Sequence, residues 1–143
     1  MGIRVVWDNP QQTIVRYIYD ERWTWDEFFR AKAEAAALIG TVDYKVGVIM
    51  DAPPNVQLPP NMLTHAKSAL QNRHPNTAMI VIVTTRPFLR TMINTLVKLT
   101  KGQHASIYLC ANVDEAREII RDRLESDKDS TLTKRYRELN PRP

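Results

Sequence analysis

The sequence contains one cysteine and only four glycines among its 143 residues. Because Cys110 stands alone, an internal disulfide and a cysteine-based zinc site are both excluded, which fits a reducing cytoplasm. We interpret Cys110 as a small buried apolar residue at the end of a strand. The scarcity of glycine also excludes a glycine-rich loop of the kind that wraps phosphate groups.

Long hydrophobic runs are also missing. The longest, "AMIVIV" at 78–83, is far shorter than the roughly 20 apolar residues that a membrane span requires. The opening "MGIRVVWD" has no apolar core of a signal peptide. We therefore expect no membrane insertion and a cytoplasmic location.

Catalytic motifs are absent as well. The histidines His65, His74 and His104 are scattered, with no His-x-x-x-His pair and no serine in a Gly-x-Ser-x-Gly turn. No pair of acids has catalytic spacing. We predict that the protein is not an enzyme and uses no cofactor or metal ion.

The signature of a nucleic-acid binder is weak. The net charge is only +4, from 20 Lys and Arg against 16 Asp and Glu, and both signs are scattered along the chain. The most basic segment, "TKRYREL" at 133–139, holds a single aromatic residue. Since basic stripes with interleaved aromatics are typical of nucleic-acid binding, we expect no nucleic-acid partner.

What the chain does have is regular alternation between strand and helix patterns. The segments "IRVVW" and "TIVRYIY" flank the turn residues "DNPQQ", which predicts a hairpin over 3–19. The segments at 44–50, 78–84 and 105–111 are almost continuously apolar, as in strands buried on both faces. Helical patterns follow at 24–40, 60–73, 87–100 and 113–125.

Two of these helices carry start signals. Thr24 stands three residues before Glu27, and Asn112 three before Glu115, which is the spacing of a capping box. Gly40 ends the first helix. The element order predicts an α/β fold with a mostly parallel mixed sheet, an N-terminal antiparallel hairpin and about four covering helices. We expect one domain over 1–125 and a polar tail over 126–143, helical in part and docked on a neighbouring subunit.

The order of elements across about 3–125 resembles the STAS domain, named for sulfate transporters and anti-sigma factor antagonists. More narrowly, "DERWTWDEF", "LPPNMLTHAK" and "RHPNTAMIVIV" look like the bacterial single-domain branch known as STAS-like or CRAL-TRIO-like. The resemblance implies a non-enzymatic regulatory module that binds another protein.

The strand "VGVIMD" runs into the loop where this resemblance can be tested. In the anti-sigma factor antagonists, a strand-terminal acid is followed by an Asp-Ser-Ser-Gly-like helix start whose serine is phosphorylated. Asp51 matches the acid, but the helix start reads "PPNM" at 59–62, without serine or glycine. We therefore expect no phosphorylation switch, including at Thr64 or Ser68 further along the helix.

The loop at 52–60 has two interpretations. Its prolines make it a stiff connection that lowers the entropy of the unfolded chain. Alternatively, the polar residues Asp51, Asn55, Gln57 and Asn61 form one lip of a shallow site at the carboxyl ends of the parallel strands, where open α/β sheets bind ligands or partners.

The second lip would be "VTTRPF" at 83–88. Thr84 and Thr85 end a strand, and Arg86 precedes a proline and the free amides of a helix, an arrangement that favours a small anion. This predicts an alternative function as a carrier or sensor of a small molecule, anion or lipid. A carrier should enclose at least about 300 Å³, which a protein-binding module does not need.

The helix at 87–100 carries more apolar residues than one face against a sheet can use. The surplus indicates either a deeply packed helix or an interface with another protein, and we favour an interface that contains Leu89, Met92, Ile93 and Leu96. Exposing so many apolar side chains is uncommon in a soluble monomer, so we expect a homodimer or a constitutive protein partner to cover them.

Overall fold

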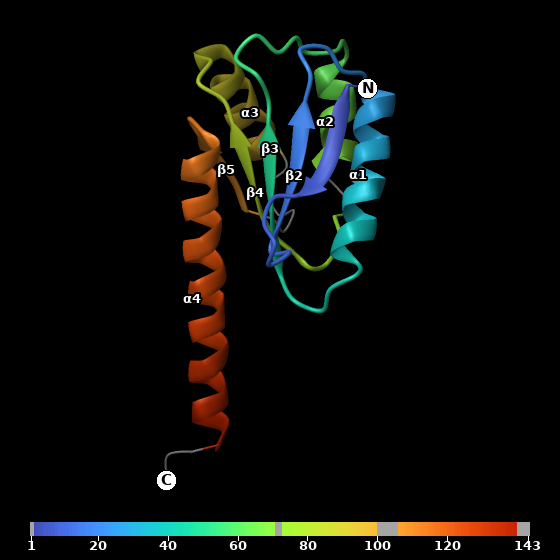
Figure 1. The fold of residues 1–143 in the computed structure, drawn as a ribbon. Coiled ribbons are helices and arrows are strands. Elements are labelled where there is room, and N and C mark those ends of the chain that lie inside the picture. The colour runs from blue at the N-terminus through green and yellow to red at the C-terminus, as the bar shows by residue number, and fades with distance from the viewer. Residues whose placement is uncertain (1, 71–72, 100–105, 140–143) are drawn as a thin grey trace.

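The computed structural model describes residues 2–70, 73–99 and 106–139, and it confirms the α/β class. A five-strand mixed sheet is covered by four helices in this part of the chain (Figure 1). The strands are β1 (Ile3–Trp7), β2 (Ile14–Tyr19), β3 (Val46–Asp51), β4 (Thr77–Val83) and β5 (Ser106–Cys110). The helices are α1 (Trp25–Ile39), α2 (Met62–Leu70), α3 (Pro87–Leu99) and α4 (Val113–Leu139).

The strands lie in the order β1-β2-β3-β4-β5, the same as their order in the sequence. The predicted hairpin pairs β1 with β2 antiparallel, and the other three pairs are parallel. In the turn, the side-chain oxygen of Asn9 accepts from the backbone N–H of Thr13 at 3.0 Å, and Gln12 takes a positive φ of 57°. The carboxyl ends of the parallel strands β2 to β5 therefore all lie at the same end of the sheet, which we call the strand-end edge.

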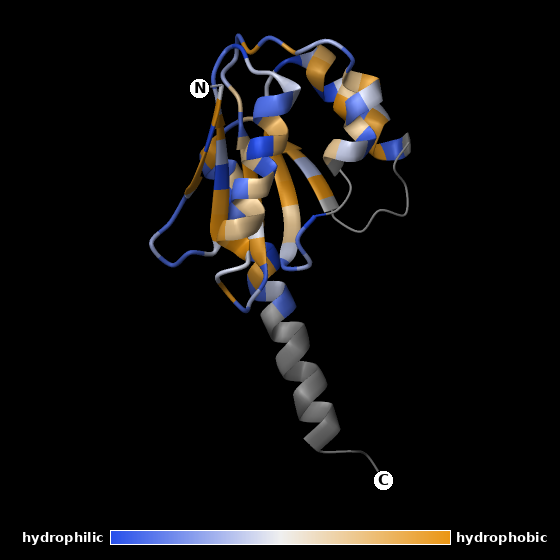
Figure 2. Ribbon diagram, turned by 90° about the vertical axis from the view of Figure 1, so that its right-hand side faces the viewer, coloured by the Kyte–Doolittle hydropathy of each residue, from blue (hydrophilic) through white to orange (hydrophobic). Residues whose placement is uncertain are grey.

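The two faces of the sheet have different covers. Because every crossover from β2 to β5 moves in one direction, the right-handed rule puts α1, α2 and α3 on the same face. Val15, Val48 and Ile80 belong to the core on that side. Ile49 and Val81 alternate with them along their strands and belong to the core beneath α4. Figure 2 shows the sheet coloured mainly as hydrophobic between helices of mixed colour.

Helix α1 packs closely on its side of the sheet. Its buried residues are Phe28, Ala31, Ala35 and Ile39, and the two alanines let the helix axis approach the strands. The predicted capping box is confirmed: Thr24 accepts from the N–H of Glu27, whose carboxylate accepts from the N–H of Thr24. Gly40 follows as the C-cap.

Helix α4 covers the other face over β3, β4 and β5. Ala116 and Ile120 are fully buried there, and a Cβ on Gly47 would lie only 2.3 Å from Ile120 Cγ2. At its start, Asn112 Oδ1 accepts from the N–H of Glu115 at 2.9 Å. The return bond differs from the predicted box, because the Glu115 carboxylate accepts from the N–H of Ala111.

The helix start after β3 differs from the sequence prediction. Helix α2 begins at Met62, so the prolines at 59–60 precede it instead of occupying its first turn. Asn61 lies between them and the helix with a positive φ of 63°, a conformation that asparagine tolerates better than most residues. The prolines therefore set the path of the loop, and Asn61 turns the chain into the helix.

The polar segment predicted as a tail continues α4. The helix runs without a break from Val113 to Leu139, so position 125 is not an element boundary, and 140–143 lie outside the described residues. Figure 1 shows α4 extending beyond the sheet, at the end opposite the strand-end edge. Its docking on a neighbouring subunit stays a prediction. Within the described ranges, no helix is long and apolar enough to cross a membrane.

Candidate functional site

An apolar cavity of about 140 Å³ lies between the sheet and helices α2 and α3, and we call it the strand-end cavity. Its walls come from the start of α1, the ends of the central strands, the loop after β3, and one side of both α2 and α3. The lining is almost wholly apolar. It comprises Tyr19, Trp23, Trp25, Phe28, Met50, Ala52, Val56, Leu58, Met62, Ala66, Ala69, Ile82, Val83, Thr84, Leu89, Met92, Ile93, Leu96, Val97 and Ile107.

Four aromatic residues form one wall of the cavity. Trp23 packs edge-on against Tyr19 at 5.4 Å and against Trp25 at 5.1 Å between ring centroids, and Phe28 completes the cluster. Trp25 Nε1 donates to the carbonyl of Pro60 at 2.8 Å, which joins this wall to the loop before α2. Burial raises the pKa of Tyr19 well above its usual value, so its phenol stays neutral.

One polar group in this wall lacks a partner. Trp23 Nε1 is buried, and no hydrogen-bond acceptor meets it among the described residues. A buried indole N–H normally finds an acceptor, because leaving it unpaired costs roughly 1–3 kcal/mol.

Helices α2 and α3 form the opposite wall, and this changes the role of the predicted interface. Leu89 and Leu96 are buried, Met92 and Ile93 are half-buried, and all four line the cavity. The expected surplus stripe is therefore turned toward the sheet instead of toward water. On α3 the exposed large hydrophobic residue is Phe88, with 69% of its surface accessible. The apolar side chains of α3 lie away from bulk water because this side of the helix faces the cavity as well as the sheet.

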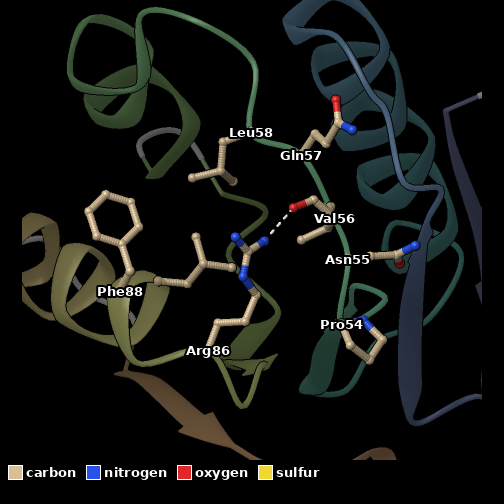
Figure 3. Close-up of a pocket in the computed structure, with 8 residues that line it drawn as sticks. Pro54, Asn55, Val56, Gln57, Leu58, Arg86 and Phe88 are labelled. Atoms are coloured by element: carbon tan, nitrogen blue, oxygen red, sulfur yellow. Dashed lines mark hydrogen bonds between the residues drawn. The ribbon is translucent and has the colours of Figure 1, made fainter.

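The cavity adjoins an open pocket of about 460 Å³ at the strand-end edge, which we call the mouth pocket (Figure 3). Val56, Leu58 and Leu89 line both spaces, so the two lie on either side of these side chains. The rest of the mouth pocket is formed by Pro54, Asn55, Gln57, Arg86 and Phe88.

Arg86 is the charged residue of the mouth pocket. Its Nη1 donates to the carbonyl of Val56 at 2.5 Å, and Figure 3 shows the guanidinium between the loop after β3 and the start of α3. The backbone N–H of Arg86 donates to Thr84 Oγ1 at 3.2 Å, and Arg90 Nε donates to the Thr84 carbonyl at 3.0 Å. The buried Thr84 thus fixes the segment that carries Arg86.

The predicted site residues are only partly brought together. Asn55 and Arg86 line the mouth pocket, and Thr84 supports Arg86 while lining the cavity. Thr85 is exposed, and Asn61 is exposed at the turn into α2, and neither lines the two spaces. The two predicted lips are therefore real neighbours, but they contribute fewer side chains than expected.

Asp51 belongs to an ion-pair network on the other face of the sheet. It lies on the α4 side of the sheet, where its carboxylate is paired with Arg16. Asp8, whose side chain is only 2% exposed, lies 3.6 Å from Arg16 and receives two hydrogen bonds from Arg117 of α4 at 2.9 and 3.0 Å. We assign Asp51 to this network, which joins the hairpin, β3 and α4, and not to the mouth pocket.

The contribution of the aromatic wall and of α2 to a cavity was not predicted from the sequence. The signal was present in "RWTWDEFF", because two tryptophans follow β2 at the strand-end edge and exceed what the sheet needs. For α2, Ala66 and Ala69 are small where larger apolar residues would close the gap. Small size alone does not distinguish close packing from a cavity, so these two positions gave no sequence signal.

The side chains of Cys110, His65, Thr64 and Ser68 could react chemically but do not line the cavity. Burial is the main cause that raises the pKa of the Cys110 thiol, which donates to the Asn112 carbonyl at 3.2 Å. His65 packs beside the Trp25 ring at 4.9 Å between centroids. Thr64 and Ser68 are exposed on α2, and the absence of a phosphorylation switch there stays a prediction. Within the described ranges, no group of three or more His, Cys, Asp or Glu could hold a metal ion.

Comparison of the chain with protein-family models, curated proteins and solved structures finds no match. The α/β fold with its five-strand mixed sheet is therefore the level at which this chain can be classified.

Proposed function

We propose that the protein binds a small hydrophobic molecule in the strand-end cavity and acts as its carrier or sensor. The observation that carries this proposal is the apolar cavity itself, which lies next to the larger mouth pocket. The open mouth pocket, at about 460 Å³, falls within the roughly 300–1,000 Å³ of small-molecule sites, whereas the cavity alone, at about 140 Å³, is below the volume expected of a carrier. Apolar walls with few polar groups are also typical of such sites.

The energetics of an empty cavity support the proposal. The apolar side chains around about 140 Å³ of unfilled space lack packing partners, which costs stability. The unpaired N–H of Trp23 adds to this cost. A ligand that fills the space would supply the missing packing contacts, so binding would stabilise the fold.

The volume also limits the ligand. An apolar cavity of about 150 Å³ in another protein accommodates benzene, so the inner part of the ligand here is about the size of one ring. The remainder of the molecule would extend past Val56 and Leu89 into the mouth pocket. A phenylalkyl compound meets both conditions.

The proposal predicts that 4-phenylbutan-1-ol, a neutral probe, binds the wild-type chain. At ten times its Kd, the probe should raise the Tm by about 3–5 °C. It should also change the fluorescence of Trp23 and Trp25, which line the cavity.

Two variants, each with an alanine replaced by leucine, test where the probe binds. Ala66→Leu fills the cavity and should weaken probe binding at least about tenfold without lowering the Tm of the free protein. Ala33→Leu, on the exposed side of α1, is the matched control and should bind as wild type does. An unchanged wild-type Tm, or equal binding by Ala66→Leu and wild type, would refute the proposal.

A second candidate function is the STAS-like interaction module that the sequence resemblance implies. The observation in its favour is a pair of exposed hydrophobic residues, Leu63 at 72% and Phe88 at 69%, each in the first turn of its helix. A pull-down from source lysate, with mass spectrometry of proteins and small molecules, would separate the two functions. A protein retained by wild type and lost in Leu63→Ser and Phe88→Ser would favour the module.

A further inference from the structure

We infer that the bound molecule is an apolar monocarboxylic acid whose carboxylate is held by Arg86 in the mouth pocket. This inference rests on the proposed function and names the chemical class of its ligand. Three features of the site support it: where Arg86 lies, how its charge is balanced, and how firmly its backbone is held.

Arg86 lies where one end of a bound molecule would emerge. The strand-end cavity and the mouth pocket share Val56, Leu58 and Leu89, so a ligand with its ring in the cavity would reach the mouth pocket by passing between these side chains. Arg86 lines the space just beyond them (Figure 3). The polar end of such a ligand would therefore meet the guanidinium.

The charge of Arg86 is not balanced by an acid. Among the residues that the structure describes, no carboxylate lies within ion-pair distance of it. Arg16 and Arg117, by contrast, both pair with Asp8. The half-buried Arg90 adds a second positive charge one helical turn away. A partly buried cation without a counter-ion is costly, and an anionic ligand would offset that cost.

The hydrogen bonds of Arg86 leave donors available. The guanidinium has five N–H donors, and the Val56 carbonyl accepts from Nη1. The bond to Val56 and the support from Thr84 hold the side chain and backbone before any ligand arrives. A planar guanidinium fixed in this way matches the two oxygens of a carboxylate.

The site accommodates a ligand with a single acid group. The strand-end cavity has an almost wholly apolar lining, so a second charge on the ligand would be buried without a partner. The ligand class is therefore an apolar body, about one ring wide, with a single carboxylate.

The test compares 4-phenylbutanoic acid with 4-phenylbutanamide, which has the same shape but no charge, at pH 7.5 by calorimetry. We expect the wild-type chain to bind the acid at least about tenfold more tightly, a difference of about 1.4 kcal/mol. A higher salt concentration should weaken binding of the acid and leave binding of the amide unchanged, because only the acid interacts through charge.

Variants assign the preference to Arg86. Arg86→Gln should lose the preference for the acid while its affinity for the amide stays within about twofold, and Arg86→Lys should keep part of the preference. Arg4→Gln, an exposed position on β1, is the charge-matched control and should behave as wild type does.

The outcomes separate this inference from the proposed function. Equal, salt-independent binding of acid and amide by wild type would overturn the role of Arg86 and leave the hydrophobic site intact. Binding of neither compound, nor of 4-phenylbutan-1-ol, would overturn both. If Arg86→Gln did not fold, the wild-type comparison of acid with amide and its salt dependence would still decide the matter.

Discussion

At the residue scale, Asp8 shows how one buried charge can hold several elements together. It comes directly after β1, yet its carboxylate receives two hydrogen bonds from Arg117 of α4, 109 positions later in the chain. The same carboxylate lies beside Arg16 of β2. Its side chain is 2% exposed, so solvent screens these interactions little.

We predict that Asp8→Ala lowers the free energy of unfolding by about 2–3 kcal/mol, because it removes the two charged hydrogen bonds to Arg117, while Arg16 keeps Asp51 and Arg117 keeps Asp114 as partners. Urea denaturation monitored by circular dichroism measures the change. The matched control is Asp114→Ala, which removes another carboxylate bonded to Arg117 but one that is 90% exposed. That variant should stay within about 0.5 kcal/mol of wild type, and equal losses in the two variants would contradict the prediction.

At the element scale, the contact between β3 and α4 depends on a missing side chain. Gly47 lies in the middle of the sheet with Ile120 directly above it, and a Cβ there would meet three atoms of Ile120 within 3.0 Å. Glycine is unfavourable in a strand, so its presence here is explained by close approach and not by propensity.

We predict that Gly47→Ala destabilises the fold by about 1–3 kcal/mol, the usual cost of overpacking. In the double variant Gly47→Ala with Ile120→Ala, the loss should be smaller than the sum of the two single losses, because the clash is gone. Gly40→Ala is the control, since Gly40 has a helical φ of −66° and its nearest Cβ contact is 3.2 Å. Thermal unfolding of the four variants would decide, and strict additivity would refute the close contact.

Much of the element order could be predicted because local chemistry determines it. The apolar runs that became β3 and β4 have no other stable place than inside a sheet, and the Thr24 capping box marks the start of α1 by hydrogen bonds within four residues. The start of α2 was placed wrongly because Asn61 adopts a positive φ, which the sequence permits but does not require.

The candidate site was less predictable, for a tertiary reason. The apolar residues of α3 are visible in the sequence, but their direction depends on how far the helix lies from the sheet. That distance is set by side chains from α1, α2 and the loop after β3. Asp51 was misassigned for a similar reason, because its partner Arg16 is 35 positions away in the chain.

At the scale of the whole molecule, the homodimer remains a prediction, but α3 is now a poor candidate for its interface. Leu89 and Leu96 are buried, Met92 and Ile93 are half-buried, and all four line the strand-end cavity, which leaves little of their surface for a second subunit. We therefore expect light scattering at tens of micromolar to give the same mass for wild type and Phe88→Ser. A wild-type dimer that becomes a monomer in Phe88→Ser would contradict this expectation and restore an interface on α3.

The position of α4 in the sequence has a consequence for synthesis of the protein. Ile49, Met79 and Val81 belong to strands that are complete by residue 83, yet Ala116 and Ile120, which cover them, come more than 30 residues later. During synthesis these strands leave the ribosome before α4 does, so one face of the growing sheet stays exposed to water until α4 has emerged. A chaperone that recognises apolar strands would find its target during this interval and lose it once α4 emerges.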